Sequence, residues 1–490
     1  MYRKTQVRGA VVMALLLPLA ACTLEPRYSR PDSLPATAYP QGLAYGETGI
    51  ETGGASVAPA DLGWRDLLTD PYLQQLVEIG LRNNRDLRVA MLTVQELQAQ
   101  YRIQSAALFP EVSAFADRSR SRSPADLSRT GVEGTTSSYS VGLSLGWEID
   151  FFGKLRSLRR AALEQYLASA EGSKAAHILL VSQVAQQYLT MLACDDLLRV
   201  TDETLRTART SYDIVKLQFD IGAGSELDVR QAETVVELAQ SNRAVQLRAR
   251  AQAENALMQL IGEPLPLPAS GAAPRRLDDQ NILEDLPAGL PSELLTRRPD
   301  VHEAEALLRS ANANIGAARA AFFPSISLTG TGGTASAKLS GLFKAGSAAW
   351  TVDPALDLPI FNAGANRANL EAARVQRDIA VAQYQKTVQA AFREVSDALA
   401  ARGTYDEQIA SLARMREAQR RRLELSELLY RNGESSYLDV LTAQTDLYDA
   451  QLLLVQARVE RLTSLVDLYR ALGGGWIERT GDAPRPATAP

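Results

Sequence analysis

Few residues of this chain have the types and spacing that chemistry requires. His177 and His302 are the only histidines and fall in different helical segments, so they favour neither a histidine metal site nor a catalytic pair. The glycine-rich run at 330–333 has the glycine content of a phosphate-binding loop but lacks a lysine-threonine partner, which favours an outer loop after a strand. No nucleophile with an adjacent base can be identified. The sequence therefore predicts a protein that is not an enzyme and needs no metal or cofactor.

The two cysteines have different predicted roles. Cys194 lies in a helical tract and is predicted to be a small core residue, because a single remaining thiol cannot form an internal disulfide. Cys22 follows three basic residues and an apolar run from Ala10 to Ala21, which together have the form of a secretory signal. Leu19-Ala20-Ala21-Cys22 resembles a bacterial lipobox, which implies removal of residues 1–21 and lipidation of Cys22, here with palmitate. The residue after Cys22 is Thr23. An aspartate at this position would resemble an inner-membrane retention signal, so its absence predicts the outer membrane as the destination.

The charge of the chain argues against nucleic acid as a partner. The 490 residues carry a formal net charge of −5, and loss of three basic residues with the signal leaves about −8. An acidic chain of this kind implies no basic surface for a nucleic-acid backbone. After residue 21, no apolar run approaches the roughly 20 residues of a membrane-spanning helix.

The elements that carry these residues occur twice along the chain. Ala107-Leu108-Phe109-Pro110 reappears as Ala321-Phe322-Phe323-Pro324, and Gly222 reappears as Gly433 with a Leu-Asp-Val run after each. The offset of about 210 residues is far longer than the 20 to 50 residues of solenoid repeats. The sequence therefore predicts two halves of comparable structure.

Each half contains a helical tract of unusual length. Lys154 to Ile221 and Ala365 to Asn432 contain no proline and one glycine each, and each tract amounts to about 100 Å of helix at 1.5 Å per residue. Both end in a glycine-bearing turn, from which a second helix returns to Ile261 or Leu472. The pattern predicts two long antiparallel helical hairpins. The last returning helix carries a four-three apolar seam typical of a coiled coil: Leu441, Tyr448, Leu452, Val455, Val459, Leu462, Val466 and Tyr469.

Short tracts of period two lie between the helices. Tyr139 to Ile149 alternates large apolar with small or acidic residues, the tracts at 326–328 and 350–360 do the same, and 112–116 is a fainter version. This predicts four strands per chain, each near the 9 to 11 residues that cross a bilayer when tilted. Arg118, Arg120 and Arg122 are placed in a solvated connection between the first strands, with contact to lipopolysaccharide phosphates as the alternative.

Four strands are too few to close a barrel. Unpaired backbone groups are costly in hydrocarbon, so a spanning sheet must be closed. Copies of the chain must then share one barrel: two chains would give eight strands, and three would give twelve with room for water. The predicted assembly is a pipe.

A family resemblance rests on motifs that run in order from about Cys22 to Trp476. They are Trp147-Glu148-Ile149-Asp150-Phe151-Phe152-Gly153, Arg298-Pro299-Asp300-Val301, Phe323-Pro324-Ser325-Ile326, Leu358-Pro359-Ile360-Phe361-Asn362-Ala363-Gly364, Leu438-Asp439-Val440-Leu441 and Ala471-Leu472-Gly473-Gly474-Gly475-Trp476. The chain resembles the outer-membrane factor family of tripartite efflux systems, of the TolC and OprM type, in its NodT-like lipoprotein branch. The resemblance implies an all-α plus β-barrel membrane fold: a homotrimer with a 12-stranded outer-membrane β-barrel, continuous with a 12-helix periplasmic α-barrel.

The resemblance also implies a function, partners and sites. The protein would be an exit duct for small molecules such as drugs or toxic compounds, lipid-anchored in the outer membrane, with a periplasmic membrane-fusion adaptor and an inner-membrane pump of the RND type as partners. A type I protein-secretion duct is the alternative, and a structural or receptor lipoprotein with soluble strands is a third possibility. The implied adaptor contacts at the helical turns are Gly222, Leu227, Gly433 and Leu438. The implied gate residues are Tyr430, Leu438, Asp439 and Thr442, although Thr442 replaces the acidic residue of the family pattern.

The domain boundaries follow from these elements. Residues 1–21 are the predicted signal peptide, 22–70 a lipid-anchored tether, and 71–262 the first repeat. Residues 263–299 are an equatorial linker, 300–476 the second repeat, and 477–490 a disordered tail.

Overall fold

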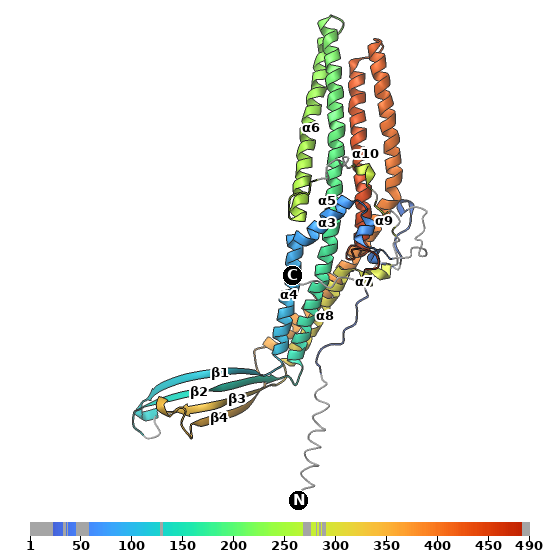
Figure 1. The fold of residues 1–490 in the computed structure, drawn as a ribbon. Helices are drawn as coiled ribbons and strands as arrows, with labels where there is room; N and C mark the ends of the chain where they lie inside the picture. Colours follow the sequence, from blue (N-terminus) through green and yellow to red (C-terminus); the bar gives the residue numbers. More distant parts are fainter. Residues whose placement is uncertain are drawn as a thin grey trace. The chain divides into compact units, whose positions relative to one another are not determined.

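The computed structural model describes residues 23–32, 36, 38–45, 58–127, 131–267, 276–280, 282–283, 286 and 291–482 (Figure 1). The predicted signal peptide and Cys22 lie outside these residues. The chain divides into two compact units, and each combines segments from both sequence repeats. The first unit comprises Met1–Asp32, Thr93–Ala170 and Glu303–Gln385; the second comprises Ser33–Leu92, Glu171–His302 and Lys386–Pro490.

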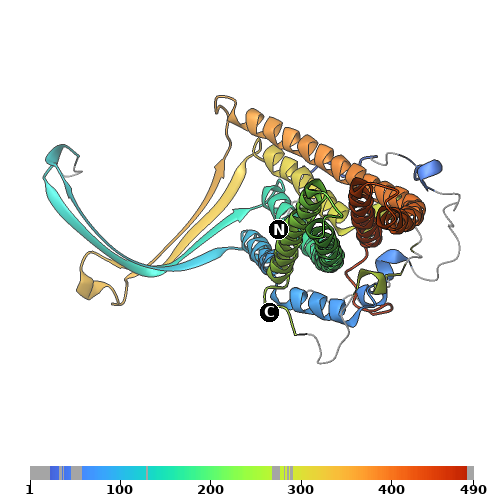
Figure 2. The same cartoon turned by 90° about the horizontal axis from the view of Figure 1, so that it is seen from above.

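The first unit contains a four-stranded antiparallel sheet. The strands β1 (Glu111–Ser123), β2 (Gly134–Ile149), β3 (Ser325–Ser336) and β4 (Ala348–Asp357) follow the order β1-β2-β3-β4. Figure 2 shows how strongly the strands bend along their length. The central pair joins β2 of the first repeat to β3 of the second. Within the described chain, β1 and β4 form the two edges of the sheet.

The sequence misplaced two motifs of this sheet. The glycine-rich run at 330–333, predicted as an outer loop, lies inside β3. A Cβ atom at Gly333 would collide with the carbonyl oxygen of Val141 on β2, so glycine is required there by the close approach of the neighbouring backbone. Arg118, Arg120 and Arg122, predicted in a connection, lie inside β1. Strand β4 also ends at Asp357, so Leu358 and Ile360 of the predicted alternation fall beyond it.

The helices confirm the predicted hairpins to within a residue at the long turns. In each half a 67-residue helix is followed by a returning helix: α5 (Lys154–Asp220) by α6 (Glu226–Ile261), and α9 (Ala365–Arg431) by α10 (Tyr437–Ala471). Before the strands of each half lie α3 (Pro71–Asn83) with α4 (Arg85–Ala106), and α8 (Pro299–Ala320). The shorter helices are α2 (Trp64–Leu67) and α7 (Leu294–Arg297). Within the described residues, every helix falls short of the length or the hydropathy that a membrane span requires.

The core of the second unit lies between the hairpins. The predicted apolar seam of α10 is buried along nearly all of its length, with Leu452 only half-buried. Its contacts with α5 include polar pairs: the hydroxyls of Thr201 and Tyr448 are 3.1 Å apart, and Gln186 Nε2 donates to Asp467 at 2.9 Å. The seam therefore packs α10 against α5, the long helix of the other half.

Arg298 of the Arg-Pro-Asp motif ties three helices together. Its guanidinium donates to Asp300 at the start of α8, to Glu394 of α9 at 2.9 Å, and to the carbonyl oxygen of Ala471 at the end of α10 at 3.0 Å. Burial lowers the pKa of Arg298, but the two carboxylates outweigh that effect and the pKa is raised overall. The motif is thus a structural ion-pair network.

The C-terminal segment is more ordered than the sequence indicated. The carbonyl oxygen of Ile477 accepts from the backbone of Trp64 at 2.9 Å, and Glu478 Oε1 accepts from Arg65 at 2.8 Å. Thr480 donates both its backbone N–H and its hydroxyl to Asp66. The prediction of disorder is wrong for residues 477–482, because these pairings fix the segment against residues 63–66.

Candidate functional site

The two long hairpins end in matching turns. Gly222 and Gly433 take left-handed conformations, with φ of 78° and 74°, and each faces open space. A serine caps the helix that follows each turn: the backbone N–H of Asp228 donates to Ser225 Oγ at 3.1 Å, and Ser436 forms a capping box with Asp439. The turn glycines therefore stop one helix, and the cap starts the next.

An apolar cluster supports the turns from inside the second unit. It consists of the buried residues Val215, Ala232, Tyr437, Val440 and Leu441, with Tyr212, Val229, Val235, Leu423 and Tyr430 packed against it. These residues come from all four long helices. Burial raises the pKa of Tyr437 to about 12, so this hydroxyl stays protonated at neutral pH.

Tyr430 links the two hairpins. Its hydroxyl donates to Gln218 Oε1 on α5 at 3.0 Å, and its ring lies 5.1 Å from that of Tyr437. Burial is the main reason that the pKa of Tyr430 is raised. Sequence reasoning missed Gln218, which carries no motif and contacts a residue 212 positions away. Its place four residues before Gly222 was the one available signal.

The remaining predicted tip residues lie around these turns. Leu227 and Leu438 keep 66% and 56% of their surface exposed, so both apolar side chains are accessible beside the turns. Asp439 accepts from the backbone N–H and the hydroxyl of Ser436, so its carboxylate serves the cap. Thr442 donates to the carbonyl oxygen of Leu438 at 2.8 Å. The position one turn after Leu438 thus carries no charge.

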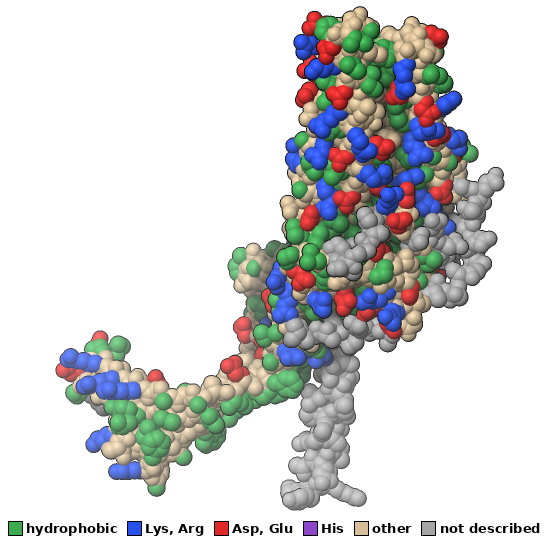
Figure 3. Space-filling view, turned by 45° about the horizontal axis from the view of Figure 1, so that its top comes forward, with side chains coloured by type: hydrophobic (Ala, Val, Ile, Leu, Met, Phe, Trp, Pro, Cys, Tyr) green, Lys and Arg blue, Asp and Glu red, His purple; other side chains and the backbone are tan. Residues whose placement is uncertain are grey.

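The sheet of the first unit has two chemically distinct faces. Directly opposite residues on antiparallel strands share a face, so the register assigns each side chain to one face. The apolar face carries Val112, Ala114, Ala116, Tyr139, Val141, Leu143, Leu145, Trp147, Ile149, Ile326, Leu328, Trp350, Val352 and Leu356. The other face is mostly small and polar, with Ser113, Ser140, Ser144, Thr329, Thr331 and Thr351, and it also carries Phe115 and the carboxylates of Asp117, Glu148 and Asp353. Figure 3 shows hydrophobic side chains gathered along the sheet, and the exposed fraction of Trp350 is 77%.

The height of the apolar face matches a bilayer. From Ile149 to Tyr139 strand β2 rises about 33 Å at the usual rise of about 3.3 Å per residue. A strand tilted by about 40° covers roughly 25 Å of membrane normal over this length, which is the height of the apolar band of outer-membrane barrels. An exposed apolar surface of this size requires a covering, and lipid fits its dimensions.

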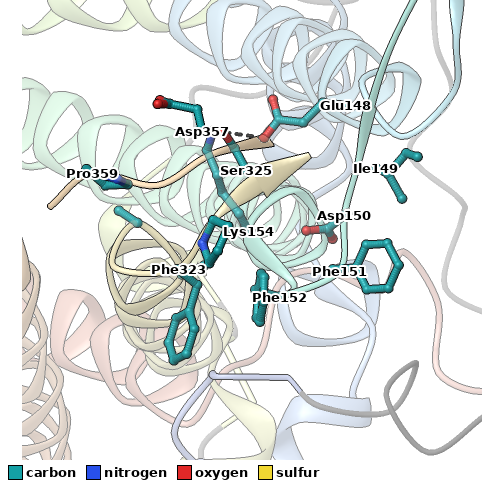
Figure 4. A pocket seen from close by; sticks show the side chains of 13 residues that line it. Glu148, Ile149, Asp150, Phe151, Phe152, Lys154, Phe323, Ser325, Asp357 and Pro359 are labelled. Atoms are coloured by element: carbon teal, nitrogen blue, oxygen red, sulfur yellow. Dashed lines mark hydrogen bonds and ion pairs between the residues drawn. The ribbon is translucent and has the colours of Figure 1, made fainter. Parts of the chain in front are cut away.

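A small pocket lies where strands meet helices in the first unit (Figure 4). Its volume is about 190 Å³, and it is lined by residues of the Trp147–Gly153 and Phe323–Ile326 motifs together with Asp357 and Pro359. Lys154 donates to Glu148 at 3.1 Å, and Asp150 accepts from the first backbone N–H groups of α5. Since these carboxylates are engaged in an ion pair and a helix cap, the pocket's residues join strand to helix.

The segment 23–32, which we call the strap, runs antiparallel to α8 in the first unit. The carbonyl oxygen of Leu24 accepts from Arg319 at 3.0 Å, and that of Pro26 accepts from Asn312 at 2.8 Å. Later strap residues meet earlier positions of α8. The start of the strap therefore lies at the strand end of α8, next to β3.

Glu305 of α8 holds the far end of the strap. Its carboxylate is buried and accepts from the hydroxyl of Tyr28 at 3.0 Å, from Arg30 at 3.0 and 2.6 Å, and from Arg309 at 2.8 Å. Burial acts to raise the pKa of Glu305, but the hydrogen bonds from Arg30, Tyr28 and Arg309 outweigh it, and the pKa is lowered. Sequence reasoning missed this site, because Glu305 belongs to no motif.

Comparison with known proteins places these features in context. The model of the family described as "Outer membrane efflux protein" matches residues 76–263 and 290–474. Two relatives from Pseudomonas putida, the toluene efflux pump outer membrane protein TtgC and the antibiotic efflux pump outer membrane protein ArpC, are each 47% identical over 471 residues, which is 96% of both chains. The open-state crystal structure of the Neisseria gonorrhoeae MtrE outer membrane channel is similar with a TM-score of 0.82 and 39% identity, and the match covers 94% of this chain and 100% of that one.

Proposed function

The chain belongs to the Outer membrane efflux protein family, and from that premise we propose that three copies form one exit duct for small molecules such as drugs or toxic compounds, solvents and antibiotics among them. As a family member the protein is an outer-membrane channel of an efflux pump, with no enzymatic activity. The substrate class rests on the two relatives, which are named for toluene and antibiotic efflux.

The sheet is the observation that carries this proposal. Its apolar face matches a bilayer in height, while its two edge strands leave backbone groups without a partner in the described chain. Such edges are excluded from hydrocarbon unless other strands pair with them. Three chains contribute twelve strands, whose closed barrel encloses water, and the small polar face lines the bore.

We assign docking of the periplasmic adaptor to the helical turns. Gly222 and Gly433 leave open space beside the chain, and Leu227 and Leu438 offer exposed apolar side chains next to it. A partner hairpin can approach a glycine closely and cover the leucine. The adaptor in turn connects the duct to an inner-membrane pump of the RND type.

The closed state of the duct rests on the same turns. Tyr430 holds one hairpin to the other through Gln218, and Leu438 narrows the aperture. Thr442 carries no charge, and Asp439 is engaged in its cap, so we propose that this duct closes with an apolar ring and no acidic ring. Lipidation at Cys22 adds a covalent palmitate anchor in the outer membrane.

The experiment that tests docking uses a turn glycine and a matched control. Gly433→Trp in the adaptor turn and Gly346→Trp in the β3–β4 connection impose comparable strain, because both glycines have positive φ and open surroundings. We expect Gly433→Trp to form trimers but fail to restore solvent and antibiotic resistance to a deletion strain, and Gly346→Trp to restore it. Equal resistance in both strains would refute the docking assignment.

The same deletion strain separates small-molecule efflux from protein secretion. For an efflux duct, loss of the protein sensitises cells to toluene and antibiotics and leaves the proteins in the medium unchanged. Loss of one secreted protein with unchanged resistance would instead identify a type I secretion duct.

A further inference from the structure

A row of three arginines on β1 has no role in the duct described so far. Arg118, Arg120 and Arg122 alternate with Ser119, Ser121 and Ser123, so all three arginines project from one face of the sheet. Arg118 lies directly opposite Tyr139, and its guanidinium is 5.5 Å from the centre of that ring. Because Tyr139 belongs to the apolar face, the arginines extend the same face that we propose contacts lipid.

The position of the row along the strand is equally defined. β1 enters the sheet from α4 at Glu111 and pairs there with the end of β2 that leads into α5. The arginines therefore lie at the opposite end: Arg118 is level with Tyr139 at the edge of the roughly 25 Å apolar band, and Arg120 and Arg122 lie beyond it. This is the boundary of the band farthest from the helices of the duct, which is the outer boundary of the membrane.

Basic residues outnumber acidic ones around the row, where Asp117 precedes Arg118 and Asp126 and Glu133 lie between β1 and β2. Arg122 donates to Glu133 at 2.8 Å, an exposed pair that water screens. Lys338 and Lys344 lie in the β3–β4 connection, and Ser336, the last residue of β3, is paired with Tyr139. Figure 3 shows Lys and Arg side chains gathered at this end of the sheet.

We propose that Arg118, Arg120 and Arg122 form a binding surface for the phosphate groups of outer-leaflet lipid. Guanidinium groups match phosphate bidentately, and these three lie at and beyond the aromatic edge of an apolar face, which is where a lipid headgroup lies. In the outer membrane that headgroup is the phosphorylated glucosamine of lipopolysaccharide. The inference rests on the proposed membrane orientation of the sheet, and it adds a ligand that the exit-duct function does not require.

The alternating sequence provides a closely matched control. Exchanging each arginine with the serine after it (R118S/S119R/R120S/S121R/R122S/S123R) keeps composition, net charge and position along the strand, but turns the guanidinium groups to the opposite face. A second variant, R118S/R120S/R122S, removes the charges. A third variant, R118K/R120K/R122K, keeps the positive charges but replaces each planar guanidinium group with an ammonium group, which cannot bind phosphate bidentately.

Binding is measured on purified trimers in detergent by native mass spectrometry, with bisphosphorylated lipid A, monophosphorylated lipid A and inorganic phosphate as separate probes. We expect the exchange and serine variants to bind bisphosphorylated lipid A at least tenfold more weakly than the unaltered protein, and the lysine variant to lose less. Loss of one phosphate from the lipid should weaken binding by the unaltered protein, and millimolar inorganic phosphate should not displace the lipid.

Several results would overturn the proposal. Wild-type affinity of the exchange variant would show that the face is irrelevant, and wild-type affinity of the serine variant would show that the arginines are irrelevant. Displacement by inorganic phosphate would identify a site for the free anion. Trimer migration and solvent resistance are measured on the same variants, so that a failure of the duct itself is distinguished from a failure of lipid binding.

Discussion

Replacing Glu305 by glutamine should release the strap from α8 without unfolding the protein. Glutamine keeps the shape of the side chain but removes the charge that Tyr28, Arg30 and Arg309 share. The side chain of Glu305 is 4% exposed, whereas those of Arg30 and Arg309 are 41% and 42% exposed. Water can therefore rehydrate the two arginines, while the acceptor loses its charge in a buried position.

The magnitude follows from these exposures. A hydrogen bond to a charged group contributes about 1.5 to 3 kcal/mol when buried, and partial exposure of the arginines reduces that contribution by screening. A loss of about 2 kcal/mol for the site as a whole corresponds to a factor of about 30 in the docked-to-released ratio of the strap. The effect should be local, because the strap is one short segment at the surface of α8.

The electron paramagnetic resonance spectrum of a spin label at the exposed Ser29 measures this ratio, because a docked strap immobilises the label and a released strap does not. We expect the docked-to-released ratio to fall about 30-fold in Glu305→Gln, while the far-UV circular dichroism of the helices remains unchanged. Glu371→Gln is the matched control, since it makes the same charge change at an exposed position of α9. An unchanged docked fraction of the strap in Glu305→Gln, or an equal loss in Glu371→Gln, would refute the argument.

Two further predictions concern the tips and pH. Replacing Tyr430 and Leu438 with alanine should raise planar-bilayer conductance, because it removes the hydrogen bond to Gln218 and the apolar constriction. Tyr430→Phe loses only the hydroxyl and should raise conductance less. Conductance at the wild-type level in the double variant would count against the gate. The folded-state pKa of Glu305 is lowered, so its contribution to strap docking is fully present above the unfolded pKa of about 4.3 and is lost as pH falls through the lower folded value. The docked fraction of the strap, measured with the same spin label, should therefore be constant from pH 7 to 5 and decrease below about pH 4, and a decrease near pH 6 would contradict this assignment.

The periodicity of apolar residues and the positions of proline and glycine predicted most of the fold. The long helices lack proline from Lys154 and from Ala365 onward, and glycine at 222 and 433 stops them, so their ends were readable to within a residue. The apolar seam of α10 was equally local, because a helix face is set by spacing along one segment. These features depend on neighbours a few residues apart, which the sequence displays directly.

Contacts between distant segments were not readable in the same way. The glycine-rich run at 330–333 has turn composition, but the approach of the β2 backbone keeps it in a strand. Gln218 accepts the hydrogen bond of Tyr430, and Glu305 accepts those of the strap. Neither residue belongs to a sequence motif, so both contacts become visible only in the folded chain. The turn residues were named from a family resemblance, so their roles stay predictions until the variants are measured.

The pairing of β2 with β3 has a consequence for how the chain matures. Tyr139 on β2 faces Ser336 on β3, so the centre of the sheet cannot form until almost 200 further residues have been made and exported. During that interval the apolar side chains of the β1–β2 ribbon and its two unpaired strand edges are exposed to water. Until the second ribbon arrives, the first is therefore the part of the chain most exposed to aggregation.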